Sequence, residues 1–79
     1  GPGVCIGRGV RIEEEADLID TVVWEGSRVG ARAWARYCVI ADQCEVGADA
    51  QLHDLALPGG SVVADGERRN RTDRSAGLE

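Results

Sequence analysis

The chain of 79 residues contains no lysine, methionine or phenylalanine, and only one histidine and two prolines. A single histidine, His53, cannot form a zinc site built from three histidines. The cysteines Cys5, Cys38 and Cys44 contain no Cys-x-x-Cys pair, so we expect no metal site and interpret them as buried, reduced thiols. Thiols without a paired framework fit a cytoplasmic protein.

Long apolar segments are also missing, so we expect no membrane crossing. The formal net charge is −5, and the nine basic residues, all arginine, are outnumbered by 14 acidic ones. This balance argues against a nucleic-acid partner, because phosphate contacts need a concentrated basic surface. There is also no Gly-rich phosphate loop between a strand and a helix.

What the chain does contain is a repeat of 17 residues. The segments Cys5–Thr21, Val22–Cys38, Val39–Leu55 and the partial repeat Ala56–Gly66 can be stacked without gaps, and apolar residues then fall into three columns. The first column holds Ile6, Val23, Ile40 and Leu57; the second holds Ile12, Val29, Val46 and Val63; the third holds Leu18, Ala35 and Leu52. Such a period indicates a solenoid, whose core forms only when repeats stack.

The columns are separated by six, six and five residues, so each repeat is expected to be a triangle with three short sides. Each side is predicted to be a short strand that bonds to parallel strands of the coils above and below, about 4.8 Å away. A helix is excluded because these spacings trace no single stripe on a period of about 3.6 residues. The predicted fold is all-β, a parallel β-solenoid of about 3.5 triangular coils whose core is the three columns.

Small residues mark further positions in the repeat. Glycine often follows the aliphatic residue, as at Gly7, Gly30 and Gly47, where a corner would tolerate it. Small or β-branched residues also recur four positions after each column, and we expect them to point inward: Val10, Ser27, Cys44, Ser61; Ala16, Ala33, Ala50; Cys5, Val22, Val39, Ala56.

The repeat divides the chain into one domain and two flanking segments. Residues 4–66 form the solenoid, and residues 1–3 are interpreted as a leader of the kind that protease cleavage leaves. Residues 67–79 have no apolar periodicity, so we expect a disordered polar tail. A domain this small with two open ends needs support, and we interpret the chain as a piece of a longer protein.

The column pattern resembles the hexapeptide repeat of left-handed parallel β-helices, as in Val29-Gly-Ala-Arg-Ala-Trp34 and Val46-Gly-Ala-Asp-Ala-Gln51. The runs Thr21-Val-Val-Trp-Glu-Gly-Ser-Arg-Val-Gly30 and Leu57-Pro-Gly-Gly-Ser-Val-Val63 are similar to the C-terminal β-helix of sugar-1-phosphate nucleotidyltransferases, the mannose-1-phosphate guanylyltransferase-like group in particular. This resemblance covers residues 4–66 and alone implies the left hand of the helix.

The resemblance implies a C-terminal module of an enzyme that converts an NTP and a sugar 1-phosphate to an NDP-sugar and pyrophosphate. Magnesium and the catalytic residues are then expected in a missing N-terminal domain, and this chain has no catalytic residue and no cofactor of its own. One alternative is a fragment of a hexapeptide-repeat acyltransferase, with the outward-facing His53 as general base at a subunit interface. Another is a free-standing assembly module.

The outward surface contains the candidate contact residues. The three aromatic residues, Trp24, Trp34 and Tyr37, all lie in the second repeat at positions predicted to face away from the core. Large exposed aromatic side chains on a polar surface indicate an interface, and we expect these three to form the contact. The partner is expected to be an identical chain, giving a homo-oligomer, or the missing catalytic domain.

Charged residues support the stacking of the repeats. Glu15, Arg32 and Asp49 alternate in sign along one column, and Arg28 is predicted to meet Glu45. Neighbouring opposite charges favour this pairing of the repeats, although exposed pairs stabilise a fold only slightly. Arg11 beneath Arg28 breaks the alternation.

Overall fold

The computed structural model describes residues 3–70, which contain twelve strands of two or three residues each and no helix. The strands are β1 (Cys5–Ile6), β2 (Arg11–Ile12), β3 (Asp17–Ile19), β4 (Val22–Val23), β5 (Arg28–Val29), β6 (Trp34–Arg36), β7 (Val39–Ile40), β8 (Glu45–Val46), β9 (Gln51–His53), β10 (Ala56–Leu57), β11 (Val62–Val63) and β12 (Arg68–Asn70). Within this range, no helix is present that could span a bilayer.

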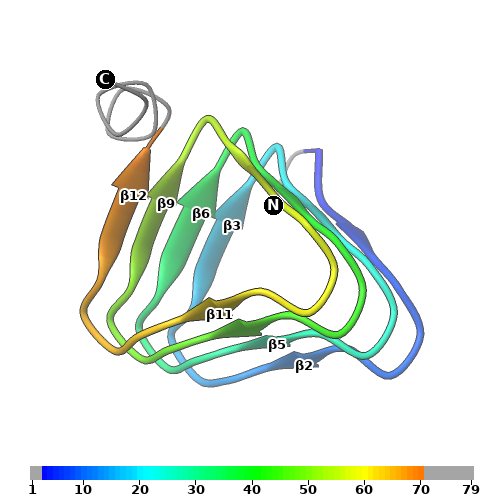
Figure 1. The fold of residues 1–79 in the computed structure, drawn as a ribbon, viewed down its shortest axis with the longest axis horizontal. Helices are drawn as coiled ribbons and strands as arrows, with labels where there is room; N and C mark the ends of the chain where they lie inside the picture. Colours follow the sequence, from blue (N-terminus) through cyan, green and yellow to red (C-terminus); the bar gives the residue numbers. More distant parts are fainter. Residues whose placement is uncertain (1–2, 71–79) are drawn as a thin grey trace.

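The strands form three parallel sheets, one on each side of a triangular solenoid (Figure 1). Sheet A contains β1, β4, β7 and β10; sheet B contains β2, β5, β8 and β11; sheet C contains β3, β6, β9 and β12. Ile6 pairs with Val23, and Ile12 pairs with Val29, so each residue lies beside the residue 17 positions later and the predicted period is confirmed. In Figure 1 the chain turns clockwise as later coils come toward the viewer, which is the left-handed sense.

Within residues 3–70, each corner of the solenoid contains one residue with a positive φ angle. The left-handed conformation strains residues that have a Cβ, and glycine adopts it at no such cost. Gly7, Gly30 and Gly47 do not hold these positions; a Cβ on Gly30 would instead lie 2.6 Å from the backbone nitrogen of Ala48, so this glycine permits close stacking. The twelve positive-φ residues among the described residues are Gly3, Gly9, Glu15, Asp20, Gly26, Arg32, Tyr37, Gln43, Asp49, Asp54, Gly60 and Gly66.

The core lies inside the triangle and follows the three predicted columns. Eight column members are buried: Val23, Val29, Ala35, Ile40, Val46, Leu52, Leu57 and Val63. The three members in the first coil differ, because no coil covers them from below among the described residues. Ile6 and Ile12 are 47% and 38% exposed, and Leu18 is only partly buried.

The smaller inward positions differ from the prediction on one side of the triangle. After sheet C the buried residues are Thr21 and Cys38, not Val22 and Val39. Val39 is 43% exposed, and Cys5, in the same column, is exposed as well. The expectation that all three cysteines are buried is therefore wrong for Cys5, which stands on the outer face of sheet A, whereas Cys38 and Cys44 are buried.

The solenoid continues beyond Gly66, where the apolar pattern ends. Strand β12 pairs with β9, so that Arg69 lies beside Leu52 in the third column. The pairing needs only backbone groups, as in the bond from the Gln51 N–H to the Glu67 carbonyl at 2.9 Å. Residues 67–70 thus belong to the fold and not to a disordered tail; residues 1–2 of the predicted leader and 71–79 of the tail lie outside the described residues.

Candidate interaction surface

The outer faces of the three sheets differ in chemical character because neighbouring residues of a strand point to opposite sides. The outward residues of sheet A are Cys5, Val22, Val39 and Ala56, all apolar. Those of sheet B are Arg11, Arg28, Glu45 and Val62. Sheet C presents two outward positions per strand, in the order Asp17, Trp34, Gln51, Arg68 and Ile19, Arg36, His53, Asn70. Sheet A is therefore the one outer face of the described residues whose strands carry no charge.

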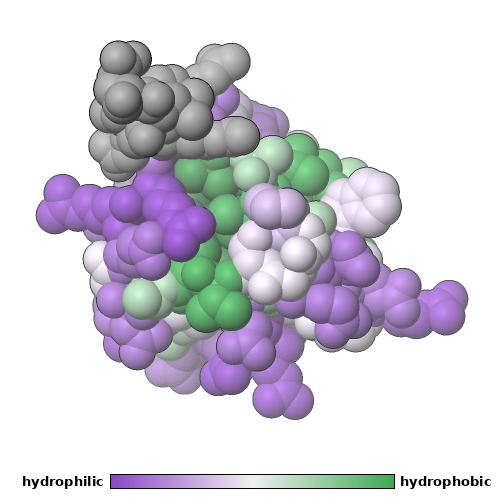
Figure 2. Space-filling view, in the orientation of Figure 1, coloured by the Kyte–Doolittle hydropathy of each residue, from purple (hydrophilic) through white to green (hydrophobic). Residues whose placement is uncertain are grey.

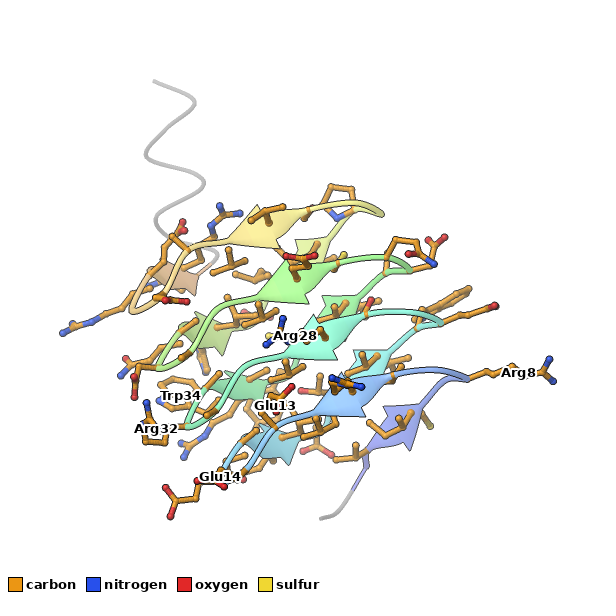
Figure 3. All side chains as sticks on the ribbon, turned by 90° about the horizontal axis from the view of Figure 1, so that it is seen from below. Arg8, Glu13, Glu14, Arg28, Arg32 and Trp34 are labelled. Atoms are coloured by element: carbon orange, nitrogen blue, oxygen red, sulfur yellow. The ribbon has the colours of Figure 1, made fainter. Side chains whose placement is uncertain are left out.

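The structure does not bring the three aromatic residues together. Trp34 lies on sheet C, where the guanidinium carbon of Arg36 is 4.8 Å from its ring centroid (Figure 3). Trp24 follows β4 at the corner between sheets A and B, which is opposite sheet C, and is 54% exposed. Tyr37 precedes β7 at the corner between sheets C and A, and is 57% exposed. Trp24 and Tyr37 thus border sheet A from its two sides, whereas Trp34 belongs to a different face.

His53 is an exposed residue at the end of β9. Its ring contacts the ring of Tyr37 one coil below, with centroids 5.9 Å apart and an interplanar angle of 80°, an edge-to-face arrangement. The contact places the imidazole beside the Tyr37 ring at the corner next to sheet A. His53 therefore belongs to the surroundings of Tyr37 in this structure.

The two buried thiols are held by backbone carbonyl groups. The Cys38 thiol donates to the carbonyl of Arg36 at 3.1 Å, and burial raises the pKa of this thiol above its ordinary value. The Cys44 thiol lies 3.2 Å from the carbonyl of Pro58 in the next coil. No cluster of three or more potential metal-binding side chains occurs within residues 3–70.

Ion pairs connect neighbouring coils. Arg32 donates to both carboxylate oxygens of Asp49 at 3.0 and 3.1 Å, and this bidentate bond raises the pKa of the guanidinium. Arg28 lies above Arg11 in sheet B, and its Nε atom is 3.4 Å from Glu13 of the first coil. Arg28 also pairs with Glu45 in the predicted register, whereas its ion pair is with Glu13 in the coil of Arg11.

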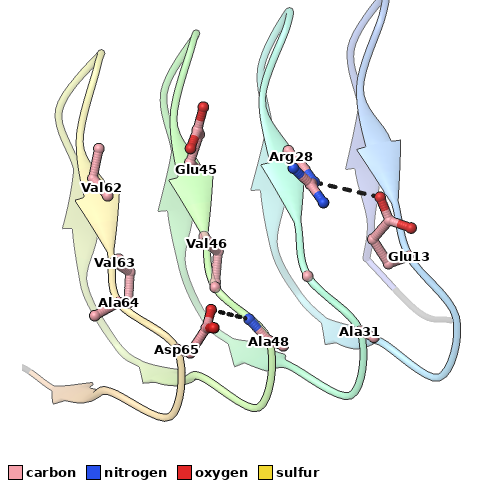
Figure 4. A pocket seen from close by; sticks show the side chains of 12 residues that line it. Glu13, Arg28, Ala31, Glu45, Val46, Ala48, Val62, Val63, Ala64 and Asp65 are labelled. Carbon is pink, nitrogen blue, oxygen red and sulfur yellow. Dashed lines mark hydrogen bonds and ion pairs between the residues drawn. The ribbon is translucent and has the colours of Figure 1, made fainter.

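A shallow groove of about 570 Å³ runs along the outer side of sheet B (Figure 4). Glu13, Arg28 and Glu45 lie on one side of it, and Asp65 lies on the other, where its carboxylate accepts a hydrogen bond from the Ala48 N–H at 3.0 Å. Both signs of charge line the groove, so it does not select a ligand by charge.

A larger hollow of about 900 Å³ lies at the C-terminal end of the solenoid. Val39, Leu55 and Leu57 line it on one side, and the strand residues Arg68 and Arg69 line it on the other. Figure 2 shows this end, with apolar side chains in the middle and charged side chains around them. The end of the last coil is thus apolar inside and charged at its border.

The surface of sheet A was the feature that the column pattern missed. Val22 and Val39 directly precede the inward residues Val23 and Ile40 in their strands, and strand alternation alone would have placed them outside. The arrangement offers an apolar face with an aromatic ring at each border, and Val39 and Ala56 of this face also line the hollow at the C-terminal end. Such a face is suited to contact with another protein surface.

Comparison with known protein families gives a match that covers most of the chain. The family described as the GMPPB C-terminal domain matches residues 1–70 of the chain, which includes all twelve strands. No curated protein matches the chain.

Proposed function

Because the chain belongs to the GMPPB C-terminal domain family, we propose that it is the non-catalytic C-terminal β-helix of a sugar-phosphate nucleotidyltransferase and that it serves assembly of the enzyme. The parent reaction joins an NTP and a sugar 1-phosphate to give an NDP-sugar and pyrophosphate. In this proposal, the magnesium ion and the groups that bind the nucleotide belong to an N-terminal catalytic domain in the cytoplasm, and the solenoid supplies a contact surface.

One observation carries the proposal. Trp24 and Tyr37 are 54% and 57% exposed at the two borders of sheet A, on a scaffold whose interior is filled by side chains. Exposed rings of this size are enriched in protein contacts, because they bury a large area at a small cost in side-chain entropy. The corners fix the backbone beneath both rings, so they are presented to a partner in a preformed arrangement.

The catalytic part of the proposal has a direct test. The purified chain is incubated with magnesium, GTP and mannose 1-phosphate, and pyrophosphate release is followed. We expect no release above the rate without protein. Turnover that is retained after repeated purification would contradict the non-catalytic assignment. A parallel assay with acetyl-coenzyme A addresses the acyltransferase alternative, in which acyl transfer that disappears in His53→Ala would replace this proposal.

The assembly part is tested by measuring the mass in solution. Multi-angle light scattering over a series of concentrations is expected to give a mass above the monomer mass of 8.4 kDa for the wild type. The double variant Trp24→Ala/Tyr37→Ala is expected to shift toward the monomer. Trp34→Ala is the matched control, because this ring lies on sheet C against Arg36, and we expect it to leave the mass unchanged. A folded wild type that stays monomeric at every concentration would contradict self-assembly and would leave the catalytic domain as the partner.

A further inference from the structure

The outer surface of sheet A is apolar over all four coils. Its outward residues are Cys5, Val22, Val39 and Ala56; Cys5 and Ala56 are exposed, Val22 is partly buried and Val39 is 43% exposed. Covering an apolar face of this kind, bordered by exposed rings on both sides, with another apolar surface is energetically favourable.

The distribution of charge over the three sheets indicates which surface would cover sheet A. The outward positions of sheet B include Arg11 and Glu45, and those of sheet C include Asp17 and Arg68, so either sheet would bury charged groups against apolar side chains. A buried charge without a partner is strongly unfavourable. Sheet A of a second copy carries no charge on its strands and has the same strand spacing, so it is the complementary surface that this chain itself provides.

We propose that two copies of the chain associate through sheet A, with the solenoid axes antiparallel. A two-fold axis along the strands of sheet A then places coil 2 against coil 3 of the partner subunit. Val22 faces the partner's Val39, and Cys5 faces the partner's Ala56. The proposal rests on the assembly function proposed above and names the face and the orientation through which assembly takes place.

The borders of sheet A favour this orientation over the parallel one. The corner column of Trp24 contains only small or ring residues in the other coils, namely Gly7, Ala41 and Pro58. In the antiparallel arrangement, Trp24 meets the partner's Ala41, which leaves room for the indole. At the other border Tyr37 meets the partner's Asp20, and a phenol can donate a hydrogen bond to a carboxylate. In a parallel arrangement, the indole of Trp24 would instead cover the carboxylate of the partner's Asp20.

The size of the face determines how the contact must be detected. Four strands about 4.8 Å apart and a width of about 15 Å give roughly 300 Å² per chain, or about 600 Å² in total. Specific, stable interfaces bury about 1,200–2,000 Å² in total, so the contact between isolated domains is weak and exchanges rapidly. Capture by a covalent cross-link is therefore the suitable experiment.

Thiol cross-linking with a short bismaleimide distinguishes the two orientations. Cys38 and Cys44 are buried, so Cys5 is the accessible native thiol among the described residues. In the antiparallel contact, Cys5 lies about three coils, roughly 14 Å along the solenoid axis, from the partner's Cys5. Ala56→Cys places a thiol directly opposite the partner's Cys5 across facing sheets about 10 Å apart, a separation too long for a disulfide but within the span of the cross-linker. We expect at least tenfold more cross-linked dimer from Ala56→Cys than from the wild type, and no such increase from the control Val62→Cys on sheet B.

A second pair of variants tests the face itself. Val39→Glu places a charge in the centre of sheet A, and Val62→Glu places the same charge at an outward position of sheet B in the last coil, where Val62 is 64% exposed. Far-UV circular dichroism establishes that both variants are folded. We expect Val39→Glu to reduce the dimer formed by Ala56→Cys at least tenfold, and Val62→Glu to leave it unchanged.

Each remaining outcome overturns the proposal. Efficient dimerisation of the wild type through Cys5 would show the parallel orientation. Equal cross-linking of Ala56→Cys and Val62→Cys would show random collision. An oligomer detected by light scattering that Val39→Glu does not weaken would refute sheet A as the contact while the proposed assembly function stands. An Ala56→Cys variant that gives no more cross-linked dimer than the wild type, in a chain that is monomeric at all concentrations, would refute both.

Discussion

The substitution Ser27→Ala should destabilise the solenoid far more than its small change in volume suggests. Ser27 is buried, with 1% of its surface exposed, in the column between sheets A and B. Its hydroxyl group donates to the carbonyl of Ala41 at 2.6 Å and accepts the N–H of Cys44 at 3.0 Å. One side chain thus connects two polar groups of the next coil. No buried side-chain polar atom of the described residues lacks a partner, so this hydroxyl belongs to a fully satisfied interior.

The expected magnitude follows from the groups that the substitution leaves behind. Alanine provides no acceptor for the Cys44 N–H and no donor for the Ala41 carbonyl. A buried polar group that loses its partner costs about 1–3 kcal/mol, so we expect a loss of about 2 kcal/mol in the free energy of unfolding. For a domain of this size, 1 kcal/mol corresponds to roughly 4–8 °C in Tm, which gives a fall of about 8–16 °C.

Ser61→Ala provides a matched control because Ser61 occupies the same column two coils later. Its hydroxyl donates to the Pro58 carbonyl at 2.6 Å within its own turn, where the bond is exposed to solvent. Water can replace this partner, so we expect a loss of about 0.5 kcal/mol or less. Thermal unfolding followed by far-UV circular dichroism compares the two variants. Equal falls in Tm would refute the reasoning, because the substitution would then act through something other than the buried bonds between coils.

Two further predictions concern the corners and the last coil. Gln43 has a φ of 58° at a corner where Gly26 precedes it in the column, so Gln43→Gly should relieve backbone strain and raise the free energy of unfolding by up to about 1 kcal/mol, measured as a higher urea midpoint; a lower midpoint would contradict this. A hydrogen bond from Arg69 and one from the Ala64 N–H lower the pKa of Glu67 from its ordinary value of 4.5, so its contribution to stability is present above that pH and is lost as the pH falls through the folded-state pKa. Glu67→Gln should therefore lose less Tm than the wild type between about pH 5 and pH 3, and identical pH profiles would exclude the effect.

The pairing of the strands could be predicted because a solenoid places equivalent positions on top of one another. Once Ile6, Val23 and Ile40 fall in one column, the period of 17 determines all three sheets, and the observed pairs follow it. Opposite charges in one column supported the same pairing, and the bidentate bond between Arg32 and Asp49 is its direct result. The pattern of apolar and charged positions recurs in every repeat, so one sequence provides several independent observations of the same strand pairing.

The direction of side chains near the corner between sheets C and A could not be predicted with the same rule. The columns of Ile6 and Ile12 are followed by six-residue sides, but the column of Leu18 is followed by a side of five residues. The missing residue is removed from the corner, so the inward small residue comes three positions after Leu18, at Thr21, and not four positions after it, at Val22. A uniform offset of four therefore predicts that the outer column of sheet A points inward. The prediction for this column is wrong, and the face that we propose as the contact does not follow from it.

The end of the solenoid was missed because side-chain pattern and backbone pairing are separate signals. Arg69 occupies the third column beside Leu52, where an aliphatic residue was expected. Its guanidinium bonds to Glu67 and lies 3.4 Å from the Val62 carbonyl, so the charged group reaches partners at the border of the last coil. Nothing covers the last coil within the described residues, which allows an arginine in a column that buries leucine one coil earlier.

The outward side chains of sheet A differ from those of sheets B and C in carrying no charge. Because coils stack about 4.8 Å apart, each outward column is a row of near neighbours, and charges in it must alternate or find other partners. Arg32 bonds to Asp49, whereas Arg28 lies above Arg11 and turns to Glu13. Sheets B and C show that charged outward residues are compatible with a buried core, so the fold does not require an uncharged column. The apolar outer surface of sheet A is therefore not explained by the stability of the solenoid, and the contact that we propose for that surface would explain it.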